Sequence, residues 1–337
     1  MPRRSKRERL AAGLDARPVR HLHGLVPSWP GVLVLNYHRV GRSEASPWDH
    51  TLWSATPEQL DAQLACLVRD AEVVGPEDLA PGAFEGHGRR VLVTFDDGYR
   101  DNFELALPIL RSHGVRGLFF LATEFLDRST VVWWDEIAWM LHTADPGRSV
   151  PAGAGLPGPV HRFPGDAESA AQCLIRRYKE LPGHATNAYL DHLGEALGTG
   201  RCTEDPDHWM TWEMAREMQS AGMGIGGHTV THPMLARLPV EEQRAEIHGC
   251  AERLRQELGG PMRWFSYPVG SRDSFSPATE RLVEAEDVEL AFSFYGGTGR
   301  LAPERAFDVR RVDIGAHITP PLLRATLALP RLFARES

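Results

Sequence analysis

The chain has few cysteines and no long apolar segment. Its four cysteines are scattered without a Cys-x-x-Cys pair, which argues against a zinc-thiolate or disulfide framework and favours reduced thiols. The charged N-terminus is not followed by an apolar stretch, because Val32 to Leu35 is too short, so neither a secretory signal nor a membrane span is expected. These absences predict a cytoplasmic protein.

The chain has fewer basic than acidic residues, 37 against 45, and its net charge is −8. This balance argues against a general polyanion binder, so no nucleic-acid partner is expected. Residues 1–30 are instead basic, because they are rich in arginine, and we predict a disordered basic tail there. Such a tail allows weak contact with a membrane surface. No pattern in the sequence indicates an oligomeric state.

Apolar runs and amphipathic segments alternate from residue 31 onward, and the 42% apolar content is enough for a sizeable core. The predicted strands cover 31–40, 91–95, 115–121, 224–227, 264–267, 290–294 and 309–314. The predicted helices cover 58–68, 102–113, 133–141, 211–220, 240–258 and 276–285. This alternation implies parallel pairing through βαβ crossovers. About seven such units favour an α/β fold that is a distorted (β/α)7-type barrel related to the TIM barrel.

One segment breaks the alternation. Residues 143–206 are rich in glycine, proline and alanine as far as Pro164, and then helical in pattern through Leu174 and Leu190. We interpret this segment as a helical insertion over one face of a single barrel domain spanning 31–318. Residues 319–337 are then a C-terminal helix or tail.

Two adjacent carboxylates, Asp96 and Asp97, follow the predicted strand at 91–95, and Gly98 comes next. Ligand sites of parallel barrels lie beyond the C-terminal ends of their strands. Neighbouring side chains on an extended chain point to opposite sides, so one acid can bind a metal while the other handles a proton. Taken alone, the pattern fits equally a turn whose aspartates cap backbone N–H groups.

Two histidines, His228 and His232, follow the glycine-rich strand at 224–227. Pro233 disfavours a helical conformation for His232, so we expect the pair on a loop, where it meets the carboxylates at the same barrel rim. Two imidazoles and one carboxylate suit Zn²⁺ or a similar ion with one position left for water. Nearby tryptophans can wall a substrate groove or pack in the core.

At these residues the sequence resembles the polysaccharide deacetylase family, also described as the NodB-homology domain or carbohydrate esterase family 4. Thr94–Tyr99 resembles the first motif of that family, His228–His232 its H-[ST]-x-x-H second motif, and Phe265–Gly270 a variant of its third. The early Tyr37-His38 and the Phe-x-Tyr-Pro third motif are similar to those of an exopolysaccharide-modifying subgroup. The resemblance spans roughly 32–314, except for the insertion.

The resemblance implies a metal-dependent hydrolase that removes an N-acetyl group from an amino sugar in a glycan, glycolipid or related intermediate. It implies that Asp97, His228 and His232 bind the metal, expected to be Zn²⁺ with Co²⁺, Ni²⁺ or Fe²⁺ as alternatives, and that Asp96 is the general base. The candidates for holding the substrate or the oxyanion are Tyr99, Trp134, Tyr267 and Val269.

Two features depart from the family pattern. Ser266 stands where the third motif often has the arginine that orients the base. The late Leu-x-His acid has no clear counterpart, so the subgroup resemblance implies His38 as general acid, with His317 as the fallback. The missing arginine suggests an alternative, a catalytically silent carbohydrate-binding protein on the same fold. A hydrolase of another amide, ester or cyclic imide is a third reading.

Overall fold

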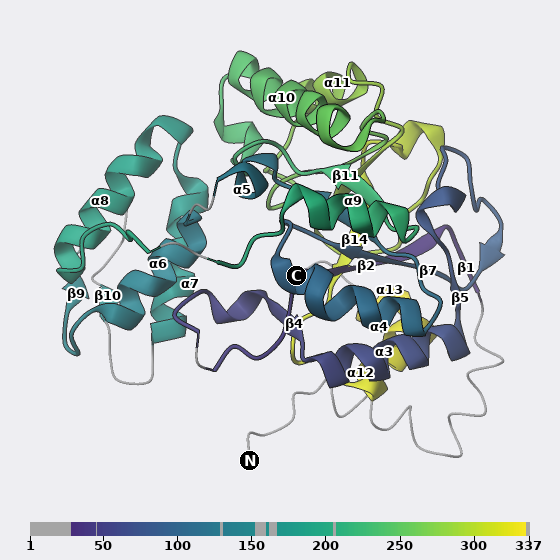
Figure 1. The fold of residues 1–337 in the computed structure, drawn as a ribbon, viewed down its shortest axis with the longest axis horizontal. Coiled ribbons are helices and arrows are strands. Elements are labelled where there is room, and N and C mark those ends of the chain that lie inside the picture. The colour runs from purple at the N-terminus through teal and green to yellow at the C-terminus, as the bar shows by residue number, and fades with distance from the viewer. Residues whose placement is uncertain are drawn as a thin grey trace.

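A computed structural model describes residues 28–44, 46–128, 131–151, 160–161, 167–204 and 207–334 (Figure 1). The predicted basic tail lies outside the described residues except for 28–30. Parts of the predicted insertion, 152–159, 162–166 and 205–206, also lie outside them, as do residues 335–337.

Seven parallel strands close into a barrel, as the sequence predicts. In ring order they are β2 (Val32–Tyr37), β14 (Val309–Asp313), β13 (Leu290–Ser293), β12 (Trp264–Ser266), β11 (Gly224–Gly227), β8 (Leu118–Leu121) and β7 (Arg90–Phe95). The ring closes where β2 pairs with β7, in register from Val32 opposite Arg90 to Tyr37 opposite Phe95. A short strand, β5 (Glu72–Val73), pairs with the first two residues of β7, whereas β8 pairs with its last two.

Strand residues alternate between the barrel interior and the surrounding helices, as the period of two requires. On β2, Val32 and Val34 belong to the inner apolar cluster, which Leu92, Phe120 and Phe292 also join. Leu33 and Leu35 belong instead to the cluster that the outer helices share. Apolar side chains therefore fill the barrel interior, and the polar residues at the C-terminal ends of the strands lie directly above this apolar layer.

Helices surround the barrel (Figure 1). They are α3 (Pro57–Asp70), α4 (Leu107–Ser112), α5 (Thr123–Asp127), α9 (Trp212–Ser220), α10 (Val240–Leu258), α11 (Pro277–Glu284), α12 (Pro320–Ala328) and α13 (Pro330–Phe333). Thr56 caps α3 by accepting from the Gln59 N–H, while the Gln59 side chain accepts from the Thr56 N–H. The predicted helix at 102–113 begins with a π-helical turn, η4 (Asn102–Ala106).

Several short elements lie between the barrel strands and the helices along the chain. Three strand pairs lie outside the barrel: β1 (Trp29–Pro30) with β6 (His87–Gly88), β3 (Arg39–Val40) with β4 (Trp53–Ala55), and β9 (Ser149–Val150) with β10 (Val160–His161). Single 3-10 turns are η2 (His50–Leu52), η3 (Pro76–Asp78), η5 (Gly183–Ala185), η6 (Leu235–Arg237) and η7 (Pro303–Arg305).

Three helices form a lobe beside the barrel: α6 (Trp133–Thr143), α7 (Ala167–Glu180) and α8 (Thr186–Leu197) (Figure 1, teal). They share an apolar cluster that includes Met140, Leu174 and Leu193, and Phe125 extends this cluster to the barrel side. The first helix of the lobe starts ten residues before the predicted insertion at 143. Among the described helices, none has the length and apolar character needed to cross a membrane.

Candidate metal centre and active-site cavity

Loops at the C-terminal ends of two barrel strands deliver the predicted site residues. Asp96 and Asp97 directly follow β7, and His228 directly follows β11. The backbone of Asp97 is left-handed with φ of +75°, and Gly98 follows at +91°, which is the tight turn expected of that glycine. His232 is also left-handed, at +57°. Positive φ is costly for residues with a side chain, so the surrounding structure must hold these loops in place.

Asp97, His228 and His232 form a buried cluster. Oδ1 of Asp97 lies 3.4 Å from Nε2 of each histidine, and the two Nε2 atoms are 3.1 Å apart. Nδ1 of His228 lies 2.7 Å from the Ser266 carbonyl oxygen. Because a carbonyl can only accept, Nδ1 carries the proton and Nε2 presents its lone pair to the cluster. Within the described part of the chain, Asp97 Oδ1 has no hydrogen-bond partner. These three groups can hold a divalent cation.

The electrostatics of the cluster suit a cation. Burial lowers the pKa of His232 to about 3, and the charge on His228 acts in the same direction, so His232 is neutral and able to act as a ligand. Burial opposes the charged form of Asp97, but the interactions with His228 and His232 outweigh it and lower its pKa. Burial also opposes a charge on His228, but the negative charges of Asp96 and Asp97 outweigh burial and raise its pKa. The same negative charges favour a cation at the cluster.

Asp96 is held by Arg311, a fully buried arginine on β14. Nη1 donates to Asp96 Oδ1 at 2.7 Å, and Nη2 donates to Oδ2 at 2.9 Å. The other N–H groups donate to Asn36 Oδ1 at 2.7 Å, Ser266 Oγ at 2.7 Å and the Ser293 carbonyl at 3.2 Å. A guanidinium has five N–H donors, and all five are used.

This arrangement fixes the protonation state of Asp96. Burial by itself raises the pKa of the Asp96 carboxyl, but the Arg311 charge, followed by that of His228, outweighs burial and holds the pKa well below its usual range. The Asn36 amide adds a hydrogen bond to Oδ2 at 3.1 Å. Asp96 is therefore ionised and oriented through both oxygens.

Arg311 is the functional residue that sequence reasoning missed. Ser266, which stands where an arginine is often found, accepts a hydrogen bond from Arg311. The signal was present on the last predicted strand, where Arg311 is two residues from Val309, a member of the inner apolar cluster. An arginine in phase with inward apolar residues requires a buried counter-charge.

The cluster opens into a cavity of about 600 Å³. One wall comes from the barrel loops and includes His38, Val269, Phe294, Asp313 and His317. The opposite wall comes from the helical lobe and includes Trp133, Trp134, Gln172, Ile175 and Lys179. The insertion that the sequence predicts over one face therefore lines the cavity.

Both candidate acids reach this cavity. His38 is half-buried and interacts electrostatically with Asp96, Asp97 and His232. His317 is exposed. Asp313, at the end of β14, interacts electrostatically with both histidines and was not singled out from the sequence.

The structure brings two of the four candidate substrate residues to the cavity. Val269 and Trp134 line it, whereas Tyr99 and Tyr267 are fully buried behind its walls. The Tyr99 hydroxyl accepts from Trp134 Nε1 at 3.1 Å, and the Tyr267 hydroxyl donates to the Phe307 carbonyl at 3.1 Å. Both tyrosines belong to the motif segments, but their side chains pack into the apolar clusters, so they support the cavity walls from behind.

A family model described as polysaccharide deacetylase matches residues 85–145 and 177–285. The matched segments contain the two aspartates, both histidines and Ser266. They do not include β2 or β14, so His38 and Arg311 lie outside the match. No curated protein matches the chain.

Solved structures share the fold at low sequence identity. The deacetylase PplD of Streptococcus pyogenes has a TM-score of 0.57 and 16% identity over 89% of this chain and 99% of its own. IcaB from Ammonifex degensii has a TM-score of 0.53 and 20% identity over 91% and 98%. BC0361, a polysaccharide deacetylase from Bacillus cereus, has a TM-score of 0.55 and 15% identity over 88% and 69%.

Proposed function

The chain belongs to the polysaccharide deacetylase family, and from this membership we propose that it is a metal-dependent hydrolase that removes an N-acetyl group from an amino sugar. The observation that carries the proposal is the buried cluster of Asp97, His228 and His232, with the oriented carboxylate of Asp96 beside it. The absence of an arginine at Ser266 suggested a silent binding protein. That argument no longer applies, because Arg311 pairs with Asp96 instead.

The donor set fits a divalent cation, since two imidazole nitrogens and a carboxylate oxygen converge on one point and that oxygen has no hydrogen-bond donor among the described residues. Asp97, His228 and His232 would hold the ion, with Zn²⁺ the metal best matched to these ligands and Co²⁺, Ni²⁺ or Fe²⁺ as alternatives. When bound, it would polarise the amide carbonyl and lower the pKa of a water molecule.

Asp96 is the proposed general base. It is ionised, and Arg311 fixes both of its oxygens. Asn36 donates to Oδ2 as well, so Oδ1 is the oxygen that keeps a second lone pair to accept the proton of the attacking water. The separation of tasks follows from geometry: Oδ1 of Asp97 is 3.4 Å from both imidazole Nε2 atoms, whereas Asp96 is 3.8 Å from His228 and is engaged by the guanidinium.

His38 is the proposed general acid. Departure of the amine requires a proton, because an amine anion is a very poor leaving group. His38 reaches the cavity, interacts with the carboxylates of the cluster and has Asp313 nearby as a partner for the imidazolium. We propose the Val269 N–H as a donor to the oxyanion, since its left-handed backbone, with φ of +65°, lies at the cavity wall. Trp134, whose ring is 4.7 Å from that of His232, would close one side of the substrate site.

The two candidate acids can be distinguished by substitution. We expect His38→Ala to lower kcat for acetate release by about 10²-fold or more, and His317→Ala, its matched control at the same cavity, to change kcat by less than about tenfold. A larger loss from His317→Ala would reverse the assignment.

Metal removal tests the proposed function directly. Acetate release from N-acetylated sugars, free and nucleotide-linked, is measured with the native protein, after chelation, and after resupply of Zn²⁺ or Co²⁺. We expect chelation to abolish release and either ion to restore it. A protein that binds these sugars but releases no acetate in its native form or with either ion would be a silent binding protein. Release of a different acyl or amide product would indicate another substrate class for the same centre.

A further inference from the structure

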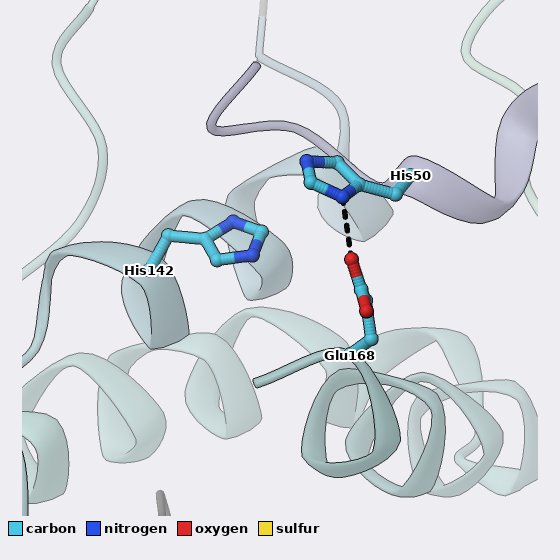
Figure 2. A group of neighbouring side chains, drawn as sticks. All are labelled: His50, His142 and Glu168. Atoms are coloured by element: carbon cyan, nitrogen blue, oxygen red, sulfur yellow. Dashed lines mark ion pairs between the residues drawn. The ribbon is translucent and has the colours of Figure 1, made fainter. Parts of the chain in front are cut away.

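A second group of metal-ligand side chains lies outside the cavity. His50 from η2, His142 from the C-terminal end of α6 and Glu168 from the start of α7 each offer a ligand atom, and these atoms lie within 4.8 Å of one another. Figure 2 shows the three side chains converging from separate segments of the chain. Nδ1 of His50 is 2.5 Å from Glu168 Oε1, and the two imidazole rings are 5.1 Å apart.

Backbone carbonyls orient both histidines. Nε2 of His50 lies 2.7 Å from the Ser46 carbonyl oxygen, and Nδ1 of His142 lies 2.8 Å from the Pro47 carbonyl oxygen. Because carbonyl oxygens only accept, these two nitrogens carry the protons. In His142 the other nitrogen, Nε2, then has the lone pair. In His50 the other nitrogen is Nδ1, and its contact with the Glu168 carboxylate contains the proton that an ion would replace. Metal-binding histidines have this same pattern, one nitrogen on the metal and the other donating to a fixed oxygen.

We propose that His50, His142 and Glu168 form a second divalent-cation site, of a kind suited to Zn²⁺, separate from the cluster in the cavity. Two imidazoles and one carboxylate are a sufficient protein ligand set, and water would complete a tetrahedron. Ligand atoms around a tetrahedral zinc ion stand about 3.3 Å apart, so the His50 to Glu168 contact must open as the ion replaces the proton between them. Glu168 can make this movement, because 56% of its side chain is exposed.

The location of the site gives it a role. His50 lies between Asp49 and Thr51, which line the active-site cavity, and Glu168 is one helical turn before Gln172, which lines it too. The Gln172 amide donates to Asp49 Oδ1 at 3.3 Å and to Thr51 Oγ1 at 3.2 Å. An ion at this site would therefore tie the helical lobe to the η2 segment directly behind the cavity wall. The ion would add to the hydrogen bonds that already join the two segments, which include these two and the one from His142 to the Pro47 carbonyl.

A simple ion pair is the competing explanation for the contact between His50 and Glu168. The chain offers a matched comparison in the exposed His248 and the half-buried Glu286. Their side chains are 3.1 Å apart and belong to neither of the potential metal-binding groups among the described residues. An ion pair needs no second imidazole and no carbonyl-fixed tautomers. The two explanations therefore differ in the role of His142, which is a ligand in a metal site and has no part in an ion pair between His50 and Glu168.

Metal content of the full chain tests the proposal without relying on activity. The His228→Ala/His232→Ala variant disables the cavity cluster and serves as the background, with folding checked by circular dichroism. After reconstitution with Zn²⁺, we expect about two equivalents in the native protein and about one in the background. Adding His142→Gln should remove the remaining equivalent, whereas adding His248→Gln should retain it. With Co²⁺, the background should give the visible absorption of a tetrahedral site, and His142→Gln should abolish it.

A background that binds no ion, or an ion retained in full after His142→Gln, would overturn the proposal. Glu168→Gln guards against misfolding of the histidine variant, because Glu168 is exposed and the substitution preserves its shape. We expect it to weaken Zn²⁺ binding in the background by about tenfold or more. Unchanged affinity in that variant would also count against the site. Because every readout is metal binding, a failure here leaves the proposed deacetylase activity unaffected.

Discussion

Asp96→Asn is expected to lower kcat for acetate release by about 10²- to 10⁴-fold, the usual size of a general-base contribution. The asparagine amide cannot accept the proton of the attacking water, although it has nearly the same shape as the carboxylate. Metal content should be unchanged, because the ligand atoms belong to Asp97, His228 and His232. Acetate release and metal content of the same preparation provide the two measurements.

The substitution also leaves the buried Arg311 without its carboxylate, so stability must be measured beside activity. Asp61→Asn is the matched control, since Asp61 is an exposed carboxylate on α3 that pairs with His113. We expect this control to keep native activity. Full activity in Asp96→Asn would contradict the assignment of the base. Loss of the metal in a folded Asp96→Asn protein would instead make Asp96 a ligand.

Arg311→Met is expected to have the second large effect, lowering kcat/KM by more than about tenfold at neutral pH and further in acid. As the proposed general base, Asp96 would act only when ionised, and its low pKa would then place the acid limb of the activity profile well below neutrality. Without the guanidinium, burial remains, and it raises the pKa of the carboxyl. The acid limb should therefore move to higher pH, so that activity at pH 5.5 falls more than activity at pH 8.

The same substitution changes stability. A carboxylate whose pKa is lower in the folded state stabilises the protein above the unfolded pKa, and this stabilisation is lost as pH falls through the folded pKa. Removing one partner of a buried pair costs about 3–5 kcal/mol, which denaturant unfolding at pH 7 would measure. Arg311→Lys keeps the charge but loses the bidentate contact with Asp96, so its activity should lie between those of the native protein and Arg311→Met.

Arg310→Met is the control for Arg311→Met. Arg310 is the preceding residue on β14, and strand alternation places its side chain on the opposite face, over the Tyr295 ring. We expect this control to leave the acid limb in place. An unchanged acid limb in Arg311→Met would mean that another group sets the pKa of Asp96.

Local patterns in the sequence were sufficient to predict much of the fold. Apolar runs such as 91–95 mark strands because a strand of a parallel barrel is buried on both faces. Thr56 and Pro57 mark the start of α3 because the capping bonds involve only neighbouring residues. The helix at 102–113 was less well predicted, because no local pattern indicated the π-helical turn at its start.

By itself, the sequence determined the barrel of alternating strands and helices, and it placed two aspartates and two histidines at strand ends that share one rim. Tertiary structure alone decided which partner holds Asp96, because closure of the ring brings Arg311 to a residue 215 positions away. It also decided that the helical lobe lines the cavity, that Tyr99 and Tyr267 lie behind the walls, and that His50, His142 and Glu168 meet. The physical reason is the same throughout: periodicity and capping act within a few residues, whereas a side-chain contact depends on how distant segments pack.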